Sequence, residues 1–276
     1  MKALRLLGSA LAKFWGDEGL FLASGIAFQV LLCLIPIALL ILSFAGSYLF
    51  SHERVMEQLG RYLEQAAPTL DAGLRENVLA IVDHRGATGI VGTVALLWIA
   101  TSLFSGLRFA LNAVYRVPTQ RGTLHGLAFD LGMVALSAAT FLVSVGLTAA
   151  IEYLRRVQTA IFPAAPGILL QLSLSYLVPF LLAVVLCFQI FHLVPNRRVC
   201  TRSALWGALF TGVLWEVAKH LFKWYVLTFK GYSLVYGSLS AAAAVLVWTY
   251  YSAAVLLLGA EVTVLLEKER TAAPGG

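Results

Sequence analysis

Six segments of this chain are each long and apolar enough to cross a lipid bilayer, which takes about 20 residues in a helix. They run over residues 20–50, 88–107, 124–151, 171–194, 203–227 and 237–266. Hydrophobic residues make up 60% of the 276 positions and charged residues only 12%, which leaves too little polar surface to coat a water-soluble globule. Because a helix satisfies its own backbone hydrogen bonds in lipid, the sequence predicts an all-α, polytopic membrane protein with six transmembrane helices.

Two further segments have the amphipathic pattern of helices that lie along a membrane surface. In residues 1–16, at about 100° per residue, one face is apolar and the opposite face is polar. The apolar face holds Leu4, Leu7, Leu11, Phe14 and Trp15, and the polar face holds Lys2, Arg5, Ser9 and Lys13. Residues 51–87 form the first outer loop and predict one or two amphipathic helices, broken near Pro68. The chain therefore divides into an interfacial helix (1–16), a six-span membrane domain (17–266) and a disordered cytoplasmic tail (267–276).

The basic residues of the short loops predict the orientation of the spans, because cytoplasmic loops carry an excess of lysine and arginine. With the amino terminus inside, the cytoplasmic segments contain Lys2, Arg5, Lys13, Arg108, Arg116, Arg121, Arg197, Arg198, Arg202, Lys268 and Arg270. The basic residues of the opposite side are fewer and are diluted along a longer loop. An even number of spans places both termini on one side, so we expect both in the cytoplasm.

The fifth span carries four ionisable side chains on one face of its helix: Glu216, Lys219, His220 and Lys223. A charge near the bilayer centre costs about 2.5–3.5 kcal/mol on insertion scales, so these groups are expected to face protein, water or one another. Two interpretations remain open. The four residues form a self-neutralising structural seam with Lys223 extended to the outer interface, or they line a polar cavity for an anionic or zwitterionic substrate.

Three other charged residues are weaker candidates for a functional role. Glu261 and Arg108 lie near the cytoplasmic ends of their spans, where anchoring at the membrane interface is a competing explanation. Asp130 lies within the third span and is a weaker candidate than either.

Small residues in the sixth span mark a face that can approach another helix closely. They are Gly237, Ser238, Ser240, the alanines at 241–244, Ser252 and Ala253. Small residues at this spacing are typical of helix contacts inside membranes, so the pattern predicts tight packing of the sixth span against a neighbour.

The sequence contains no motif for catalysis or for binding a metal or cofactor. The five histidines are isolated, and no HExxH, GxSxG or Walker sequence occurs. Cys33, Cys187 and Cys200 lack zinc-type spacing. A metal-dependent nuclease needs carboxylates and histidines that converge on a cation. We therefore expect no cofactor, no metal, no nucleic-acid partner and no enzymatic activity; an intramembrane lipid-modifying enzyme is a less favoured alternative.

Several stretches occur in an order that is specific to one family. They are "ASGIAFQVLLCLIP" (23–36), "FSGLRFALNAVYRV" (104–117), "LVPNRRV" (193–199), "GALFTGVLWEVAKHLFKWYV" (207–226), "YGSL" (236–239) and "LLGAEV" (257–262). In these the chain resembles the YihY/virulence-factor-BrkB family. The resemblance implies a six-helix bacterial inner-membrane protein with cytoplasmic termini, from a family linked to envelope functions and, in pathogens, to serum resistance. The family's ribonuclease BN label finds no support in these residues.

These observations favour a transporter or flippase-like factor for an envelope-related lipid or an amphiphilic, anionic solute. Its partners are then membrane lipids, and its oligomeric state is left open. The alternative is a non-enzymatic scaffold that organises an envelope complex through its outer loop and close-packed spans. A water-filled cavity that reaches Glu216 and Lys219 would favour transport, whereas a dry, fully packed bundle would favour the scaffold.

Overall fold

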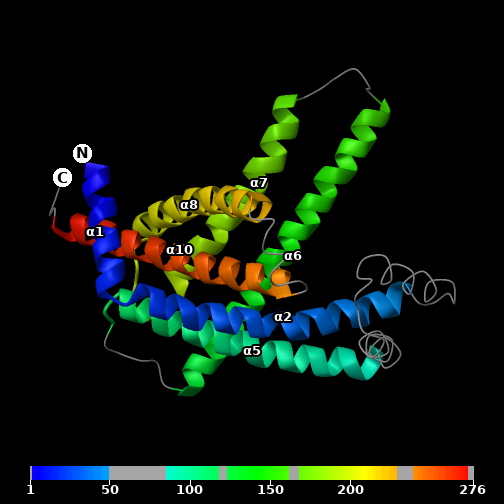
Figure 1. Cartoon of the computed structure of the whole chain (residues 1–276), viewed down its shortest axis with the longest axis horizontal. Coiled ribbons are helices and arrows are strands. Elements are labelled where there is room, and N and C mark those ends of the chain that lie inside the picture. Colours follow the sequence, from blue (N-terminus) through cyan, green and yellow to red (C-terminus); the bar gives the residue numbers. More distant parts are fainter. Residues whose placement is uncertain (1, 50–84, 118–122, 162–167, 229–238, 273–276) are drawn as a thin grey trace. The chain divides into compact units, whose positions relative to one another are not determined.

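The computed structural model describes residues 2–49, 85–117, 123–161, 168–228 and 239–272, and every regular element in these ranges is an α-helix (Figure 1). The helices are α1 (Lys2–Gly16), α2 (Gly19–Leu49), α5 (Arg85–Val114), α6 (Thr123–Ile161), α7 (Ile168–Leu193), α8 (Thr201–Thr228) and α10 (Leu239–Ala272). The predicted all-α class is therefore confirmed for the described part of the chain.

Each of the six expected spans coincides with one of these helices. Four of the helices, namely α2, α5, α6 and α10, contain a stretch long and apolar enough to cross a membrane. Among the residues whose side chains the structure describes, α7 contributes the shorter apolar stretch Leu177–Leu193, and α8 is not among the candidates. The outer-loop helices predicted within 51–87 lie outside the described residues, except that Arg85 already begins α5.

Two compact units make up the chain, and the first contains residues 1–28 and 103–276. In this unit α8 packs against both α7 and α10, α1 packs on α10, and α6 contacts α7 (Figure 1). On the α7 side, a side chain at Gly212 of α8 would lie 2.7 Å from Val184. The absence of a side chain at Gly212 therefore lets these two helices approach.

Two glycine–threonine pairs bring α8 and α10 even closer together. A Cβ atom at Gly207 would overlap Thr263, and a Cβ atom at Gly259 would overlap Thr211. Both threonines are fully buried, and each donates its hydroxyl hydrogen bond to the glycine carbonyl four residues earlier, at 2.8 Å for Thr211 and 2.9 Å for Thr263. The two helices are therefore antiparallel and meet through a reciprocal pair of glycine-xxx-threonine sequences.

This contact differs in position from the small-residue face predicted for the sixth span. The predicted face centred on residues 237–253, and positions 237 and 238 lie outside the described residues. The closest approach of α10 to α8 is instead at Gly259, further along the helix. The prediction of close packing holds for α10. Spacing within α10 did not show that Gly259 makes the contact, because the contact also depends on a threonine of the other helix.

In the second unit, residues 29–102, α2 and α5 are antiparallel neighbours. Gln29 donates a hydrogen bond to Ser102 at 3.3 Å, while a side chain on Gly92 would meet Leu40 at 3.3 Å. The α2 helix continues through Pro36, whose side chain is fully buried.

The carboxy-terminal helix is longer than the sequence indicated. Residues 267–276 were predicted to be a disordered tail, but α10 continues to Ala272, so this prediction is wrong for residues 267–272. Glu267 is buried and forms an ion pair with Arg197 at 2.9 Å. This contact explains the extra turns, because it holds the end of α10 against the segment between α7 and α8.

Candidate functional site

The four residues predicted to form a polar stripe lie on α8, away from its packed face. Lys219 Nζ and Glu216 Oε1 are 2.6 Å apart, which confirms the pairing expected from their spacing of three residues. Their side chains are 42% and 30% exposed, and His220 and Lys223 are exposed as well. Within the first unit, the four side chains therefore lie on a partly to fully exposed face of α8.

A second group of charges is partly buried and joins four separate segments of the first unit. At its centre, Lys13 of α1 pairs with Glu261 of α10, whose side chain is completely buried. The same ammonium group donates a hydrogen bond to the Val114 carbonyl at 3.0 Å, where α5 ends. Because the last carbonyls of a helix lack partners within the helix, Lys13 caps α5 while it neutralises a carboxylate of α10.

Asp17, just after α1, extends this group toward the surface. Its carboxylate lies 3.4 Å from the Lys13 ammonium and accepts a hydrogen bond from Arg116 at 3.2 Å. Burial alone would raise the pKa of Asp17, but the Arg116 hydrogen bond and the positive charges of Lys13 and Arg116 outweigh it and hold this pKa below its usual value. Asp17 therefore remains an anion between two cations.

Arg116 reaches Asp17 from a backbone conformation that non-glycine residues seldom adopt. Its φ is 53°, in the left-handed region, directly after the end of α5. The Val117 N–H bonds to the Asn112 carbonyl and the Arg116 N–H bonds to the Ala113 carbonyl, which is the Schellman arrangement of a helix end. A glycine usually fills this position, so the side chain of Arg116 is retained at a conformational cost and is held toward Asp17.

The third pair of the group lies beside the segment that joins α7 to α8. Arg197 binds Glu267 and also lies over the Tyr115 ring, 5.6 Å from its centre. Glu267 also accepts a hydrogen bond from the Cys200 backbone N–H at 3.4 Å. The backbone N–H groups of Arg202 and Ser203, together with the charge of Arg270, lower the pKa of the Cys200 thiol.

The remaining sequence candidates, Arg108 and Asp130, bind each other. Their ion pair measures 2.9 Å, links α5 to α6 and is largely buried on both sides. A Cβ atom at Gly126 would lie 2.7 Å from an Arg108 guanidinium nitrogen, so a larger residue there would displace the guanidinium group. Arg108 thus joins two helices and is not a surface anchor.

Sequence reasoning did not bring Lys13 and Glu261 together. It gave interfacial anchoring as a competing explanation for Glu261 and placed Lys13 on the polar face of an interfacial helix, whereas the structure pairs the two. One signal was available in the sequence. Glu261 lies in the apolar run 255–266, which contains no basic residue, so its partner had to come from another segment.

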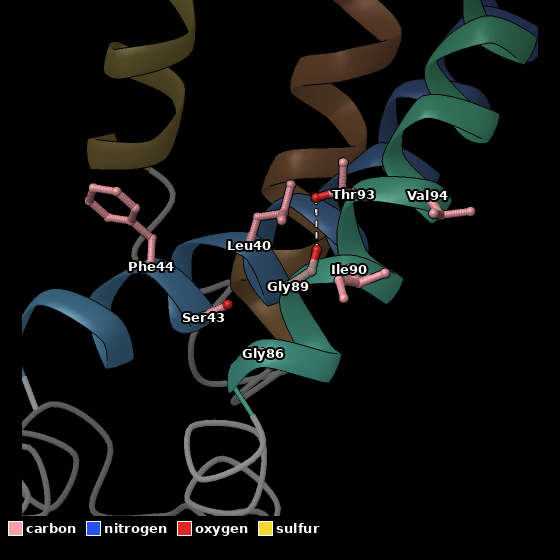
Figure 2. A pocket seen from close by; sticks show the side chains of 8 residues that line it. All are labelled: Leu40, Ser43, Phe44, Gly86, Gly89, Ile90, Thr93 and Val94. Carbon is pink, nitrogen blue, oxygen red and sulfur yellow. Dashed lines mark hydrogen bonds between the residues drawn. The ribbon is translucent and has the colours of Figure 1, made fainter.

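A hollow in the second unit has a different chemical character. Its volume is about 600 Å³, and it lies between α2 and α5 (Figure 2). The lining residues are Leu40, Ser43, Phe44, Gly86, Gly89, Ile90, Thr93 and Val94. Figure 2 shows the Thr93 hydroxyl bonded to the Gly89 carbonyl, at 2.7 Å. The described lining residues are mostly apolar, and their polar side chains are the hydroxyl groups of Ser43 and Thr93.

Long apolar helices joined by buried ion pairs define this chain as a helical integral membrane protein. The virulence factor BrkB family matches residues 10–275, and the chain belongs to that family. The stretches in which the sequence resembles the family contain Arg108, Arg116, Arg197 and Glu261, each of which forms an ion pair in the structure.

Relatives of this chain are named UPF0761 membrane proteins. One from Chlorobium phaeobacteroides is 33% identical and covers 90% of this chain and 55% of its own length. Another from Haemophilus influenzae is 25% identical over 89% of both chains, and one from Idiomarina loihiensis is 31% identical over 80% of this chain and 78% of its own. The chain thus spans about half the length of several relatives it matches. No solved structure matches it.

Proposed function

We propose that this protein is a six-span inner-membrane transporter or flippase-like factor for an envelope-related lipid or an amphiphilic, anionic solute. The observation that carries the proposal is the accessible Glu216–Lys219 pair on a membrane helix, flanked by exposed His220 and Lys223. Charged groups on such a helix are expensive unless water or a polar ligand reaches them. A zwitterionic or anionic head group can bind to an accessible stripe that presents both cations and an anion.

The position of the stripe along α8 fits a route through the bilayer. With a rise of about 1.5 Å per residue, Glu216 lies about 22 Å from Thr201, beyond the middle of a hydrocarbon core of about 30 Å. On the adjoining face, Val213, Val217 and Leu221 are exposed. A polar row beside an apolar row suits an amphiphile, whose head group follows the first while its chains remain against the second.

The ion-pair group supports a six-span topology with both termini on the same side of the membrane. It joins α1, the end of α5, the segment before α8 and the end of α10, which are the segments expected after zero, two, four and six crossings. Segments after an even number of crossings lie on one side of a membrane. In this arrangement Leu7, Leu11 and Trp15 of α1 remain exposed, which suits an interfacial position for that helix.

The native cysteines provide a test of this orientation. A membrane-impermeant maleimide is expected to label Cys200 in inside-out vesicles and not in intact spheroplasts, because Cys200 lies in the proposed cytoplasmic loop. The lowered pKa of its thiol increases the reactive thiolate fraction, whereas Cys33 and Cys187 are buried. The Cys200→Ser variant is the control for specificity. Labelling of Cys200 in intact spheroplasts but not in inside-out vesicles would show that the orientation is the opposite of the proposed one.

Transport is tested in proteoliposomes that contain only this protein. Fluorescent phosphatidylglycerol and phosphatidylethanolamine serve as probes, and the protein is expected to speed their movement between leaflets. Glu216→Gln and Lys219→Gln are each expected to slow it by roughly 10-fold or more, the equivalent of one charge-assisted contact. Because this pair is partly exposed, its contribution to stability is small, so lost flux reports on function.

The matched control for this assay is Arg202→Gln, which removes an exposed charge from the first turn of the same helix. It is expected to leave the rate unchanged. Equal rates in empty and protein-containing vesicles, for both lipids and for anionic solutes, would reject transport.

A non-enzymatic scaffold for an envelope complex is the second candidate. The glycine-mediated contact of α8 with α10 favours it, because that interface leaves no space for a passing solute. We keep the proposal that the chain has no enzymatic activity and, in particular, does not cleave RNA. Absence of flux together with a stable complex recovered from membranes would favour the scaffold over the transporter.

A further inference from the structure

Aromatic side chains on the packed side of α8 fix the rotation of this helix about its axis. Trp248 of α10 contacts both Trp215 and Phe222 of α8, with ring centroids 6.0 Å from the first and 4.9 Å from the second. The two α8 rings are about two helical turns apart, so they lie on the same side of the helix. At about 100° per residue, the charged stripe lies on a different side and remains accessible.

The charges of the stripe do not cancel. Its acid, Glu216, pairs with Lys219 at 2.6 Å. Lys223 lies one turn beyond Lys219, His220 lies on the neighbouring row, and both are exposed. Among the side chains that the structure describes, no acid forms an ion pair with His220 or Lys223. The end of the stripe therefore presents an ammonium group and an imidazole N–H group, and both are hydrogen-bond donors.

These two donors lie at an end of the span where basic residues are not expected. With a rise of about 1.5 Å per residue, Lys223 lies about 33 Å from Thr201, close to the full thickness of a hydrocarbon core of about 30 Å. In the proposed topology this is the outer head-group region. Because lysine and arginine favour the cytoplasmic side, the general distribution of charge does not account for a lysine here. A local anionic ligand does.

An apolar row borders the donors and continues toward the interior of the membrane. Trp224, one turn beyond His220, is 62% exposed, and it extends the exposed row of Val213, Val217 and Leu221. A soluble anion gains little from such a row, whereas an acyl chain covers apolar surface that would otherwise face water. The arrangement therefore favours an anion that is itself part of a lipid.

We propose that Lys223 and His220 bind the phosphate group of an anionic phospholipid whose acyl chains lie along the apolar row. Phosphate oxygens accept hydrogen bonds from both side chains, and the ammonium group neutralises the phosphate charge. Phosphatidylethanolamine carries its own ammonium group, which repels Lys223, so it binds less tightly than phosphatidylglycerol. This inference names the substrate class of the proposed transporter, and it rests on that proposed function for any part in transport.

Quenching of Trp224 fluorescence by brominated lipids tests the site in the full-length protein. The protein is reconstituted in phosphatidylcholine vesicles with a minor fraction of brominated phosphatidylglycerol or brominated phosphatidylethanolamine. The difference between the wild type and Trp224→Phe isolates the signal of Trp224 from that of the other tryptophans. Phosphatidylglycerol is expected to quench this signal at an about 5-fold lower fraction than phosphatidylethanolamine, the effect of one partly solvated charged contact.

Variants at one position show whether charge causes this preference. Lys223→Gln is expected to abolish most of it, whereas Lys223→Arg is expected to retain it, because a guanidinium group also binds phosphate. Since Lys223 is exposed, both variants are expected to fold. Lys268→Gln removes an exposed lysine from α10 and is the matched control, with the wild-type preference expected.

Equal quenching by the two lipids in the wild type would overturn the inference, as would an undiminished preference in Lys223→Gln. Glycerol phosphate is expected not to displace the brominated lipid; if it does, the site binds a soluble anion and the lipid assignment is wrong. The flux assay separates this inference from the proposed function. Flux without a preference in quenching rejects the phospholipid site alone, whereas a preference without flux supports the site and rejects transport.

Discussion

Gly259→Ala is expected to destabilise the folded protein by about 1–3 kcal/mol, the usual cost of forcing an extra carbon into a packed interior. The added Cβ would overlap the buried hydroxyl of Thr211 across the α8–α10 interface. Thr211 cannot turn away without losing its hydrogen bond to the Gly207 carbonyl. Gly207→Ala is expected to act in the same way against Thr263. Thermal unfolding of the purified protein in detergent, followed by the loss of monodisperse protein, measures both effects.

The control for this prediction is Gly146→Ala on α6, where an added Cβ would meet nothing within 4 Å. Alanine favours a helix over glycine by about 0.5–1 kcal/mol, so this variant is expected to be neutral or more stable than the wild type. Combining Gly259→Ala with Thr211→Gly removes the side chain that the added Cβ would overlap. The double variant is expected to regain part of the lost stability. Equal unfolding temperatures for Gly259→Ala and Gly146→Ala would contradict the interpretation.

The positions of the helices follow closely from the sequence, because bilayer thickness sets the length of an apolar run. The span expected at 203–227 is α8, Thr201–Thr228, and the one expected at 124–151 begins α6, Thr123–Ile161. The end of α10 could not be predicted in this way. Residues 267–272 are polar and read as a tail, but a partner on a distant segment keeps them helical.

The candidate site was predictable only where both partners lie on one helix. Glu216 and Lys219 are three residues apart, so helical geometry alone brings them together. Lys13 and Glu261 are 248 residues apart, and no periodicity within either helix relates them. Periodicity placed Lys13 opposite the apolar face of α1, but it could not show that this polar face meets a buried carboxylate and not water.

The largest effect of a single charge is expected from Lys13→Ala. The change leaves the Val114 carbonyl without its cap and removes the cation that pairs with both Glu261 and Asp17. Removing one partner of a buried ion pair costs about 3–5 kcal/mol, because the remaining group stays buried without compensation. We therefore expect a large fall in unfolding temperature and release of α1 from α10, detected as faster protease cleavage within residues 2–16.

Two variants separate this role from a general effect of charge. Arg5→Ala removes an exposed basic residue from the same helix and is expected to change stability by less than about 0.5 kcal/mol. The double variant Lys13→Met with Glu261→Gln replaces the pair by neutral groups of similar size, so it is expected to be less destabilised than Lys13→Ala alone. The buried pair would lose its proposed importance if Lys13→Ala behaved like Arg5→Ala. If the double variant were instead the least stable of the three, the attraction between Lys13 and Glu261 would outweigh the cost of burying them, and α1 would be held to α10 mainly by that charge pair.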